Sequence, residues 1–246
     1  MRTVLILMDT LNRRFLKSYH ENAEGITPNM DAFAEEAVRF DNHFIASAPC
    51  MPARRDIFTG RMNFLERGWG GMEPYDRTLQ GELRSHGVYT HITTDHTHYF
   101  ELGGDNYCSL FDTWDYHRGQ ENDPWISRVS PPFKEPDSYG RKSVQHLLNR
   151  QEYAREEKTY PTPATFLSAC RWARENRGAD NFFLMVEAFD PHEPFDAPVS
   201  YHELYGDHYS GKEFNWPGYA PVKEPEAAVL TLRNCYLAHM PQADRW

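Results

Sequence analysis

The pattern with the clearest chemical potential in this sequence is Cys-x-Pro-x-Arg, formed by Cys50, Pro52 and Arg54. Pro52 suits the first position of a helix because it has no amide proton to leave unsatisfied, and Gly60 suits the helix end. Cys50 is therefore predicted at a helix N-terminus, where unpaired amides and the helix dipole favour negative charge. Arg54 would lie one turn further along the same face. The pattern predicts a nucleophile beside its own cation, in a place that suits an anion.

A plainer interpretation of Cys50 is a small buried apolar residue beside prolines. A thiol-based redox role is a weaker hypothesis, because no second cysteine is near in the sequence. Cys108, Cys170 and Cys235 are widely separated and show neither zinc-type pairing nor a disulfide framework. The apolar run at the N-terminus lacks the features of a secretory signal. We therefore expect a cytoplasmic chain with free thiols.

Length and composition limit the class of protein. With 246 residues and 40% hydrophobic content, the chain can bury one large core, so we expect a single domain over residues 1–246. The formal net charge of −10 argues against nucleic acid as a partner, since phosphate backbones attract basic surfaces. No apolar run approaches the length of a membrane span, so we expect no membrane partner.

Alternation of apolar strands with amphipathic helices predicts the fold that must position Cys50. Buried strands are predicted at residues 3–8 and 182–188, and further strands at 40–47 and 88–93. Helices are predicted at residues 28–38, 52–59, 79–86, 162–177 and 225–239. The class is therefore α/β, with a mostly parallel (mixed) sheet that is flanked by helices. 

Two of these helices carry more detailed predictions. Thr27 is predicted to cap the helix that begins at Pro28. Thr162 is predicted to cap a second helix, which should place four residues toward the core: Phe166, Leu167, Cys170 and Ala173. The stretch 97–137 is rich in aromatic residues, glycine and proline, and we expect a long loop near a site.

Polar residues follow three of the predicted strands. Asp9 follows the first strand, Asp95 and His96 follow the strand at 88–93, and His192 follows the strand at 182–188. The carboxyl ends of parallel strands are where α/β proteins place their ligands. Asp9 also suits a turn or helix cap.

Taken in order, these segments resemble the formylglycine-dependent (type I) sulfatases of the alkaline phosphatase superfamily. Cys-x-Pro-x-Arg is the specific motif, and the others gain weight from their order along the chain. The segments that carry the resemblance are Asp9, Thr27-Pro28-Asn29-Met30-Asp31, Cys50-Met51-Pro52-Ala53-Arg54, Thr59-Gly60-Arg61 and Pro191-His192-Glu193-Pro194-Phe195. The resemblance covers most of this chain but only the N-terminal part of a full-length member, so the fold implied is a sulfatase N-terminal domain that is incomplete at its C-terminus.

The resemblance implies that a separate maturing enzyme oxidises Cys50 to formylglycine (3-oxoalanine), whose aldehyde hydrates to a geminal diol. One hydroxyl, activated by a divalent cation, attacks sulfur, and the second helps to expel sulfate. Asp9 and the modified Cys50 would ligate the cation, most simply calcium, with magnesium or manganese as alternatives. Thr10 stands where many members have a second Asp, and its hydroxyl is a weaker ligand. Arg54 would hold the diol and offset the charge of sulfate.

Histidines would complete the catalytic set. His192 matches the histidine of the family's Pro-His-x-Pro-Phe loop, which contacts sulfate or the leaving oxygen. The lysine of the family's Gly-Lys-Trp-His-Leu segment is missing after the strand at 88–93, and either His96 or His98 takes over as acid toward the leaving alcohol. The plainer interpretation is that these histidines decorate polar loops.

Full-length members supply two more metal ligands and a lysine from later segments, and nothing past Phe195 matches them. The nearest string, Asp207-His208-Tyr209, lacks a preceding apolar strand. Asp9 and Cys50 alone offer few oxygen ligands for tight cation binding. The chain is therefore expected to be a truncated sulfatase, with the remaining ligands beyond its end.

The leading hypothesis is a sulfuric ester hydrolase that acts on a small-molecule or carbohydrate sulfate ester and has the maturing enzyme as a partner. A phosphonate monoester or phosphodiester hydrolase of the same superfamily is the nearest alternative, and Asp95 in place of the lysine fits it slightly better. A non-catalytic remnant or binding module is the alternative from another class.

Overall fold

The computed structural model describes residues 1–101, 106–206 and 209–246, which form two compact units. We call them the sheet unit and the helical unit, and each is described by itself. The sheet unit comprises Met1–Leu7, Phe40–His117 and Thr165–Ala188. The helical unit comprises Met8–Arg39, Arg118–Ala164 and Phe189–Trp246.

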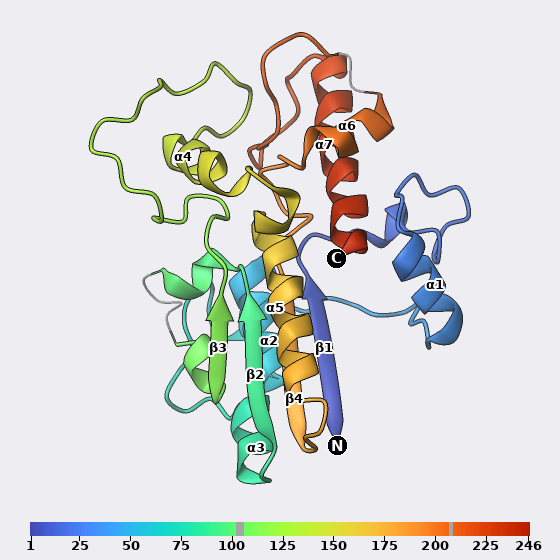
Figure 1. Cartoon of the computed structure of the whole chain (residues 1–246), viewed down its shortest axis with the longest axis vertical. Coiled ribbons are helices and arrows are strands. Elements are labelled where there is room, and N and C mark those ends of the chain that lie inside the picture. Colours follow the sequence, from blue (N-terminus) through green and yellow to red (C-terminus); the bar gives the residue numbers. More distant parts are fainter. Residues whose placement is uncertain (102–105, 207–208) are drawn as a thin grey trace. The chain divides into compact units, whose positions relative to one another are not determined.

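Four strands form the sheet, in the order β1-β4-β2-β3 (Figure 1). β2 pairs in parallel with both of its neighbours, and Ile92 lies opposite Trp114 on one side and Met185 on the other. The bounds are Arg2–Met8 for β1, Tyr89–Thr94 for β2, Thr113–Tyr116 for β3 and Phe182–Ala188 for β4. The prediction of an α/β fold with a mostly parallel sheet is confirmed.

The strands differ in burial according to their place in the sheet. Every residue of β4 is buried, as expected for a strand between two neighbours. β1 lies at the end of the strand order and alternates instead: Leu5 and Leu7 pack against the core, whereas Val4 and Ile6 are more than half exposed. The prediction that β1 is a buried strand is therefore wrong for half of its side chains.

Helix α2 (Cys50–Thr59) begins at Cys50 itself, two residues earlier than predicted. Pro52 lies in the first turn, where amides have no partner within the helix, so its missing N–H costs nothing. The helix ends as predicted at Gly60, which takes the left-handed conformation (φ 67°) that favours glycine. α3 (Leu79–Ser85) follows in the same unit.

Helix α5 (Pro161–Glu175) turns only part of the predicted face toward the sheet, since Phe166 packs on the core cluster as predicted. Ala169 is buried against Leu184 and Val186 of β4, and Trp172 packs on the same cluster. Leu167 and Cys170, which were predicted to face inward, are exposed. Thr162 lies inside the first turn of α5 rather than at its cap.

The strand predicted at residues 40–47 is wrong. Phe44 and Ile45 are largely exposed, and the segment contributes no strand to the described part of the sheet. Ser47 bonds instead to the Asp56 carboxylate through both its amide (2.8 Å) and its hydroxyl (3.0 Å). Local side-chain bonds of this kind replace a strand ladder. β3 lies inside the stretch predicted as a loop; residues 102–105 of that stretch are outside the described residues.

The helical unit contains four α-helices among its described residues. Their bounds are Pro28–Glu36 for α1, Val144–Tyr153 for α4, Val199–His202 for α6 and Glu226–Arg245 for α7. α7 continues six residues past the predicted end at His239 and contains Pro241. Its second half is buried, and Leu237 and Met240 join a core cluster with Leu16. Among the described residues, no helix is long and apolar enough to cross a membrane.

The N-terminus of α1 is capped by a residue far away in the sequence. The carboxylate of Asp244 in α7 accepts bonds from the amides of Asn29 (2.9 Å) and Met30 (2.7 Å). Thr27 occupies the cap position, but its side chain makes no cap bond, so the prediction that it caps α1 is wrong in mechanism. An aspartate at a helix N-terminus satisfies the same orphan amides and complements the helix dipole.

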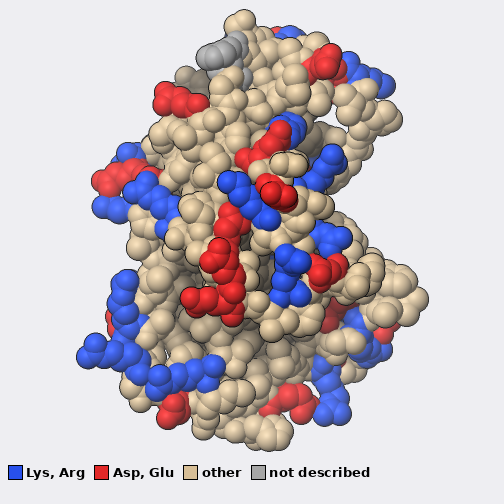
Figure 2. All heavy atoms as spheres, turned by 90° about the vertical axis from the view of Figure 1, so that its right-hand side faces the viewer, with Lys and Arg blue, Asp and Glu red and all other residues tan. Residues whose placement is uncertain are grey.

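Charge of both signs occurs on the molecular surface. On the face drawn in Figure 2, acidic and basic side chains are interspersed among uncharged residues. This mixture fits a chain with 36 acidic and 26 basic residues.

Candidate active site

Cys50 is the first residue of α2, and its side chain is half-buried. Amides at this end of a helix lack partners within the helix and attract anions. Arg54 follows one turn later and is 4% exposed. The structure therefore places the thiol and the guanidinium as the sequence predicted, at the start of one helix in the sheet unit.

A buried glutamate holds Arg54. Its Nε donates to Oε1 of Glu187 on β4 at 2.7 Å, and Glu187 is fully buried. Thr94, at the end of β2, donates to the other carboxylate oxygen at 3.4 Å. Glu187 fixes the guanidinium of Arg54 and balances its charge.

Sequence reasoning missed Glu187 and treated β4 as wholly apolar. The signal was present, because a single carboxylate in a buried run needs a charged or hydrogen-bonding partner. The sequence could not say that the partner is Arg54, which lies 133 residues away along the chain.

His96 and His98 both lie beside Cys50. The cysteine Sγ and one ring nitrogen of each histidine all lie within 4.8 Å of one another. The two rings are nearly perpendicular, with centroids 5.3 Å apart. The 3-10 turn Thr97–Phe100 directly after His96 folds the chain back, which brings both histidines to the site. The sequence could not choose between them, and the structure brings both together with Cys50.

Carboxylates contact the Nδ1 atoms of both histidines. His96 Nδ1 is 3.4 Å from Oε1 of Glu187, the same oxygen that Arg54 contacts. His98 Nδ1 is 2.9 Å from Oε2 of Glu101. The hydrogen bond at His98 places the proton on Nδ1 and orients the Nε2 lone pair for another ligand or for substrate.

A packed aromatic layer supports the histidines. Tyr99 is fully buried, its ring stacks on Tyr107 with centroids 5.0 Å apart, and it meets His96 edge-on at 4.5 Å. Burial raises the pKa of Tyr99, and the negative charge of Glu187 raises it further. Tyr99 therefore stays a neutral phenol at physiological pH and holds the His96 ring in place.

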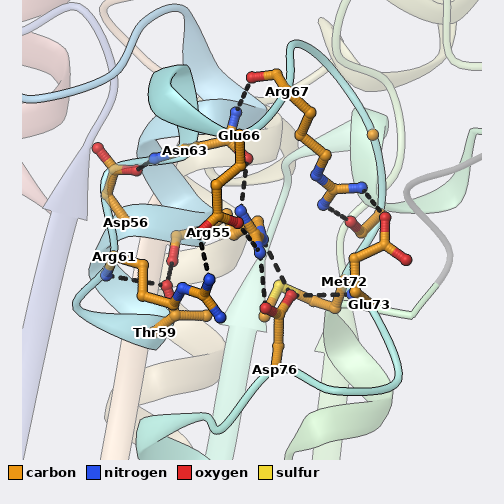
Figure 3. Close-up of polar contacts among 12 residues, drawn as sticks. Arg55, Asp56, Thr59, Arg61, Asn63, Glu66, Arg67, Met72, Glu73 and Asp76 are labelled. Atoms are coloured by element: carbon orange, nitrogen blue, oxygen red, sulfur yellow. Dashed lines mark hydrogen bonds and ion pairs between the residues drawn. The ribbon is translucent and has the colours of Figure 1, made fainter.

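The other face of α2 is fixed by a second arginine (Figure 3). Arg55 is fully buried and makes two bonds to the carboxylate of Asp76, at 2.6 and 2.9 Å. It also contacts Glu66 at 2.8 Å and donates to the side chain of Asn63 at 3.2 Å. Because these partners come from the loop that follows α2, they anchor that loop to the helix that carries Cys50.

Asp9 and Thr10 belong to the helical unit, at the point where the chain leaves β1. The Thr10 hydroxyl donates to Oδ1 of Asp9 at 2.8 Å, and Thr10 has a positive φ of 57°. The hydroxyl of Tyr236 on α7 donates to the Thr10 carbonyl at 2.9 Å and accepts from the Asn12 amide at 3.0 Å. The backbone after Asp9 is thereby held by α7.

His192 also belongs to the helical unit and is 6% exposed. Its Nδ1 donates to the carbonyl of Glu193 at 2.6 Å, with Oε1 of Glu121 at 3.7 Å. The ring packs against Phe189, with centroids 4.2 Å apart. These contacts assign the ring proton to Nδ1 and leave Nε2 as an acceptor when the ring is neutral.

A network of buried charges surrounds the loop that carries His192. Asp196 contacts His146 at 3.2 Å and Arg150 at 3.5 Å. Burial alone would raise the pKa of the Asp196 carboxyl, but His146 and Arg150 hold it well below its usual range. Burial opposes protonation of His239, yet nearby Asp190 raises the pKa of that ring. The helical unit therefore keeps several ionised groups paired in its interior.

The predicted residues thus fall into two sets. Cys50, Arg54, His96 and His98 come together in the sheet unit, whereas Asp9, Thr10 and His192 belong to the helical unit. Asp207 and His208, the nearest string to a late ligand pair, lie outside the described residues. The aromatic stretch from Tyr99 to Trp125 includes residues 102–105, which lie outside the described residues. Within the described part, aromatic rings of this stretch pack on one another, as Tyr99 does on Tyr107.

The donor atoms near Asp9 are of the kind that a hard divalent cation prefers. The Asp9 carboxylate offers oxygen ligands, and the hydroxyl of Thr10 keeps lone pairs after donating its proton to Asp9. Around Cys50 the donors are sulfur and imidazole nitrogen, which suit softer metals. Asp9 and Thr10 therefore fit the expected cation in donor type, and the unmodified Cys50 does not.

Comparison with known proteins identifies the family. A sequence model of the family described as Sulfatase matches residues 2–245, and the chain belongs to the sulfatase family. Over 190 residues it is 27% identical to the uncharacterized sulfatase YidJ of Escherichia coli K12, covering 74% of this chain and 37% of that protein. Over 235 residues it is 25% identical to the multifunctional alkaline phosphatase superfamily protein PehA of Trinickia caryophylli, covering 87% and 45%. The chain thus spans less than half the length of these two relatives.

Solved structures show the same fold. The phosphonate monoester hydrolase of Agrobacterium radiobacter superposes with a TM-score of 0.71 at 16% identity, over 99% of this chain and 57% of that one. SpPMH, a phosphonate monoester hydrolase of Silicibacter pomeroyi, superposes with a TM-score of 0.67 at 19% identity, over 100% and 57%. The fold is therefore that of alkaline-phosphatase-like sulfatases, as predicted.

Proposed function

We propose that this chain carries the nucleophile of a sulfuric ester hydrolase, made from Cys50 by oxidation to formylglycine. The observation that supports it most directly is the cluster in the sheet unit: Cys50 at the start of α2, the Arg54 guanidinium held by Glu187, and two histidines beside the sulfur. Membership of the sulfatase family supports the same reaction class.

Each side chain of the cluster has a task that its contacts allow. The N-terminus of α2 attracts the anionic group of the substrate. Arg54 offsets sulfate charge through its guanidinium, which Glu187 keeps in one orientation. His96 or His98 gives a proton to the leaving alcohol, because a carboxylate at each Nδ1 supports the protonated ring. His192 of the helical unit is assigned to the sulfate or the leaving oxygen.

A divalent cation, when bound, supplies charge neutralisation on the substrate and lowers the pKa of the attacking hydroxyl. Asp9 and Thr10 are the residues of this chain that we assign to it, with calcium as the preferred ion. The hydrogen bond from Thr10 fixes the rotamer of Asp9, and Tyr236 steadies the backbone beneath both.

We assign a small-molecule or carbohydrate sulfate ester as the substrate class. One structure with the same fold, BT4656 in complex with D-glucosamine-2-N,6-O-disulfate (TM-score 0.58, 16% identity), holds a sulfated sugar. That ligand belongs to BT4656 and supports the class only.

Mass spectrometry of the Cys50 peptide tests the proposal. The chain is co-expressed with a formylglycine-generating enzyme, and the peptide is expected to lose one sulfur and two hydrogen atoms and to gain one oxygen. Cys170→Ser serves as a control, because that exposed cysteine lies outside the motif. A cysteine that stays unmodified at position 50 under these conditions would contradict the mechanism.

A phosphonate monoester or phosphodiester hydrolase is the second candidate. It is favoured by buried Asp95, which stands where the family's lysine is missing. Turnover of an aryl sulfate and an aryl phosphonate by the matured protein separates the two candidates. Faster turnover of the sulfate supports the first, and faster turnover of the phosphonate replaces it with the second.

A further inference from the structure

We propose that, before Cys50 is modified, its thiolate binds Zn²⁺ together with His96 and His98. Its ligands are a different set from the oxygen ligands assigned to the catalytic cation, and only its effect on maturation rests on the proposed function. Its basis is the geometry of the sheet unit alone, in which one sulfur and two imidazole nitrogens lie within 4.8 Å of one another.

The donor set matches zinc in chemistry and in size. A thiolate and two neutral imidazoles form a three-ligand zinc set whose fourth position takes water. Bonds of about 2.3 Å to sulfur and about 2.1 Å to nitrogen separate tetrahedral ligand atoms by roughly 3.5 Å. The present separations are at most 4.8 Å, so they need to shrink by no more than about 1.3 Å.

The carboxylates around the histidines provide an independent argument. Zinc-binding histidines almost always donate their second ring N–H to a carboxylate, a carbonyl or water, which fixes the tautomer. Here Glu101 accepts from Nδ1 of His98 at 2.9 Å, which orients Nε2 of His98 as a metal ligand, and Glu187 lies 3.4 Å from Nδ1 of His96. A loop in which histidines only decorate the surface would not need both contacts.

Zinc binding releases one proton from the Cys50 thiol and needs no oxidant. The Cys50 S–H bond breaks, an S–Zn bond forms, and the proton passes to solvent. Zinc and the maturing enzyme then compete for the same sulfur. Zinc is therefore expected to hold the chain in its unmodified form, which gives this site a regulatory consequence.

Metal titration of the chain, produced without a maturing enzyme, tests the site. Zn²⁺ is added in competition with a chromophoric chelator, and one ion per chain is expected. Loss of a carboxylate partner of a metal ligand weakens binding by about 10–100-fold. Cys50→Ser and His96→Ala should each weaken Zn²⁺ binding by more than this. Cys170→Ser and His43→Ala, which change exposed residues of the same unit, should leave it unchanged.

Glu101→Gln keeps the test decisive if the buried variants fail to fold. Glu101 is exposed, so circular dichroism should be unchanged while Zn²⁺ binds about 10–100-fold more weakly. Unchanged affinity in this variant would remove the argument from carboxylate orientation and count against the site.

Two further readouts identify the sulfur ligand. Co²⁺ in place of zinc should give a thiolate-to-cobalt charge-transfer band that is absent in Cys50→Ser. Zn²⁺ should also slow alkylation of Cys50 by iodoacetamide, as followed by peptide mass, without slowing that of Cys170. A cobalt spectrum without the thiolate band, or equal alkylation with and without zinc, would overturn the proposal.

Discussion

Arg54 and Arg55 are neighbours in the sequence and both are buried, yet they lie on different faces of α2 and have different partners. Arg55 contacts two carboxylates and an amide from residues 63–76, within 21 positions of itself. Arg54 is held by one carboxylate on β4, 133 positions away, and lies beside Cys50 and its histidines. Arg55 is held by several partners close to it in the sequence, whereas Arg54, which we assign to the proposed site, is positioned by a partner on a distant strand.

The largest effect is expected from Arg55→Met. The substitution leaves Asp76 buried without its main cation, and breaking a buried ion pair costs about 3–5 kcal/mol of unfolding free energy. Urea unfolding followed by circular dichroism measures it. The control is Arg61→Met, since half-exposed Arg61 also pairs with Glu66 but should cost only about 0–1 kcal/mol. Equal losses in both variants would show that Arg55 is not the anchor.

Arg54→Met should affect turnover more than stability. Loss of a preorganised cation that stabilises developing charge reduces kcat by about 10²–10³-fold. The loss of unfolding free energy should be smaller than in Arg55→Met, because Arg55 binds two carboxylates and an amide of residues 63–76 and so anchors a whole loop. Steady-state kinetics of the matured protein and urea unfolding measure both quantities. Unchanged turnover with a stability loss as large as that of Arg55→Met would abolish the distinction between the two arginines.

Asp76→Asn tests the electrostatics of the structural face through pH. Burial alone would raise the pKa of Asp76, but the bonds from Arg55 and the Glu73 amide lower it. The stabilisation is therefore complete above the pKa of an unfolded Asp, about 3.9, and is lost as the pH falls through the lower folded value. At pH 7 the variant should lose about 1.5–3 kcal/mol, as for hydrogen bonds to charged groups. The difference from the parent should shrink below pH 4 in urea unfolding curves; a constant difference would contradict the assigned cause.

Thr78→Ala should give the smallest effect and no change in chemistry. The Thr78 hydroxyl accepts from the Gly81 amide at 3.1 Å and caps α3, a bond that contributes about 1 kcal/mol. Turnover and Zn²⁺ affinity should stay unchanged, because the cap lies outside the cluster around Cys50. Thr78→Ser retains the hydroxyl and should restore the lost stability. A change in turnover with Thr78→Ala would show that α3 is coupled to the cluster around Cys50.

Elements with strong local patterns were predictable from the sequence. β2 and β4 follow from apolar and β-branched runs, and the end of α2 follows from Gly60. β3 was missed because it is four residues long and lies within a loop-rich stretch. The segment 40–47 has strand-like composition, but its backbone is engaged locally, with Ser47 bonded to Asp56. Short segments are decided by tertiary partners that local patterns do not contain.

The candidate site was predictable where one motif contains it. Cys50 and Arg54 are four residues apart, so helix geometry alone relates them. Glu187 could not be assigned to Arg54, because no local rule connects a strand with a helix 133 residues earlier. His96 and His98 could not be ranked, since the turn that brings both to Cys50 depends on tertiary packing around Tyr99.

The 133 positions between Arg54 and Glu187 also delay their contact during synthesis of the chain. During synthesis at about 5–20 residues per second, Glu187 emerges on the order of ten seconds after Arg54. Until β4 joins the sheet, the Cys-x-Pro-x-Arg segment has no carboxylate partner from that strand, and Cys50 is accessible in an extended chain. For the maturation that we propose for Cys50, the segment is therefore most accessible before β4 docks.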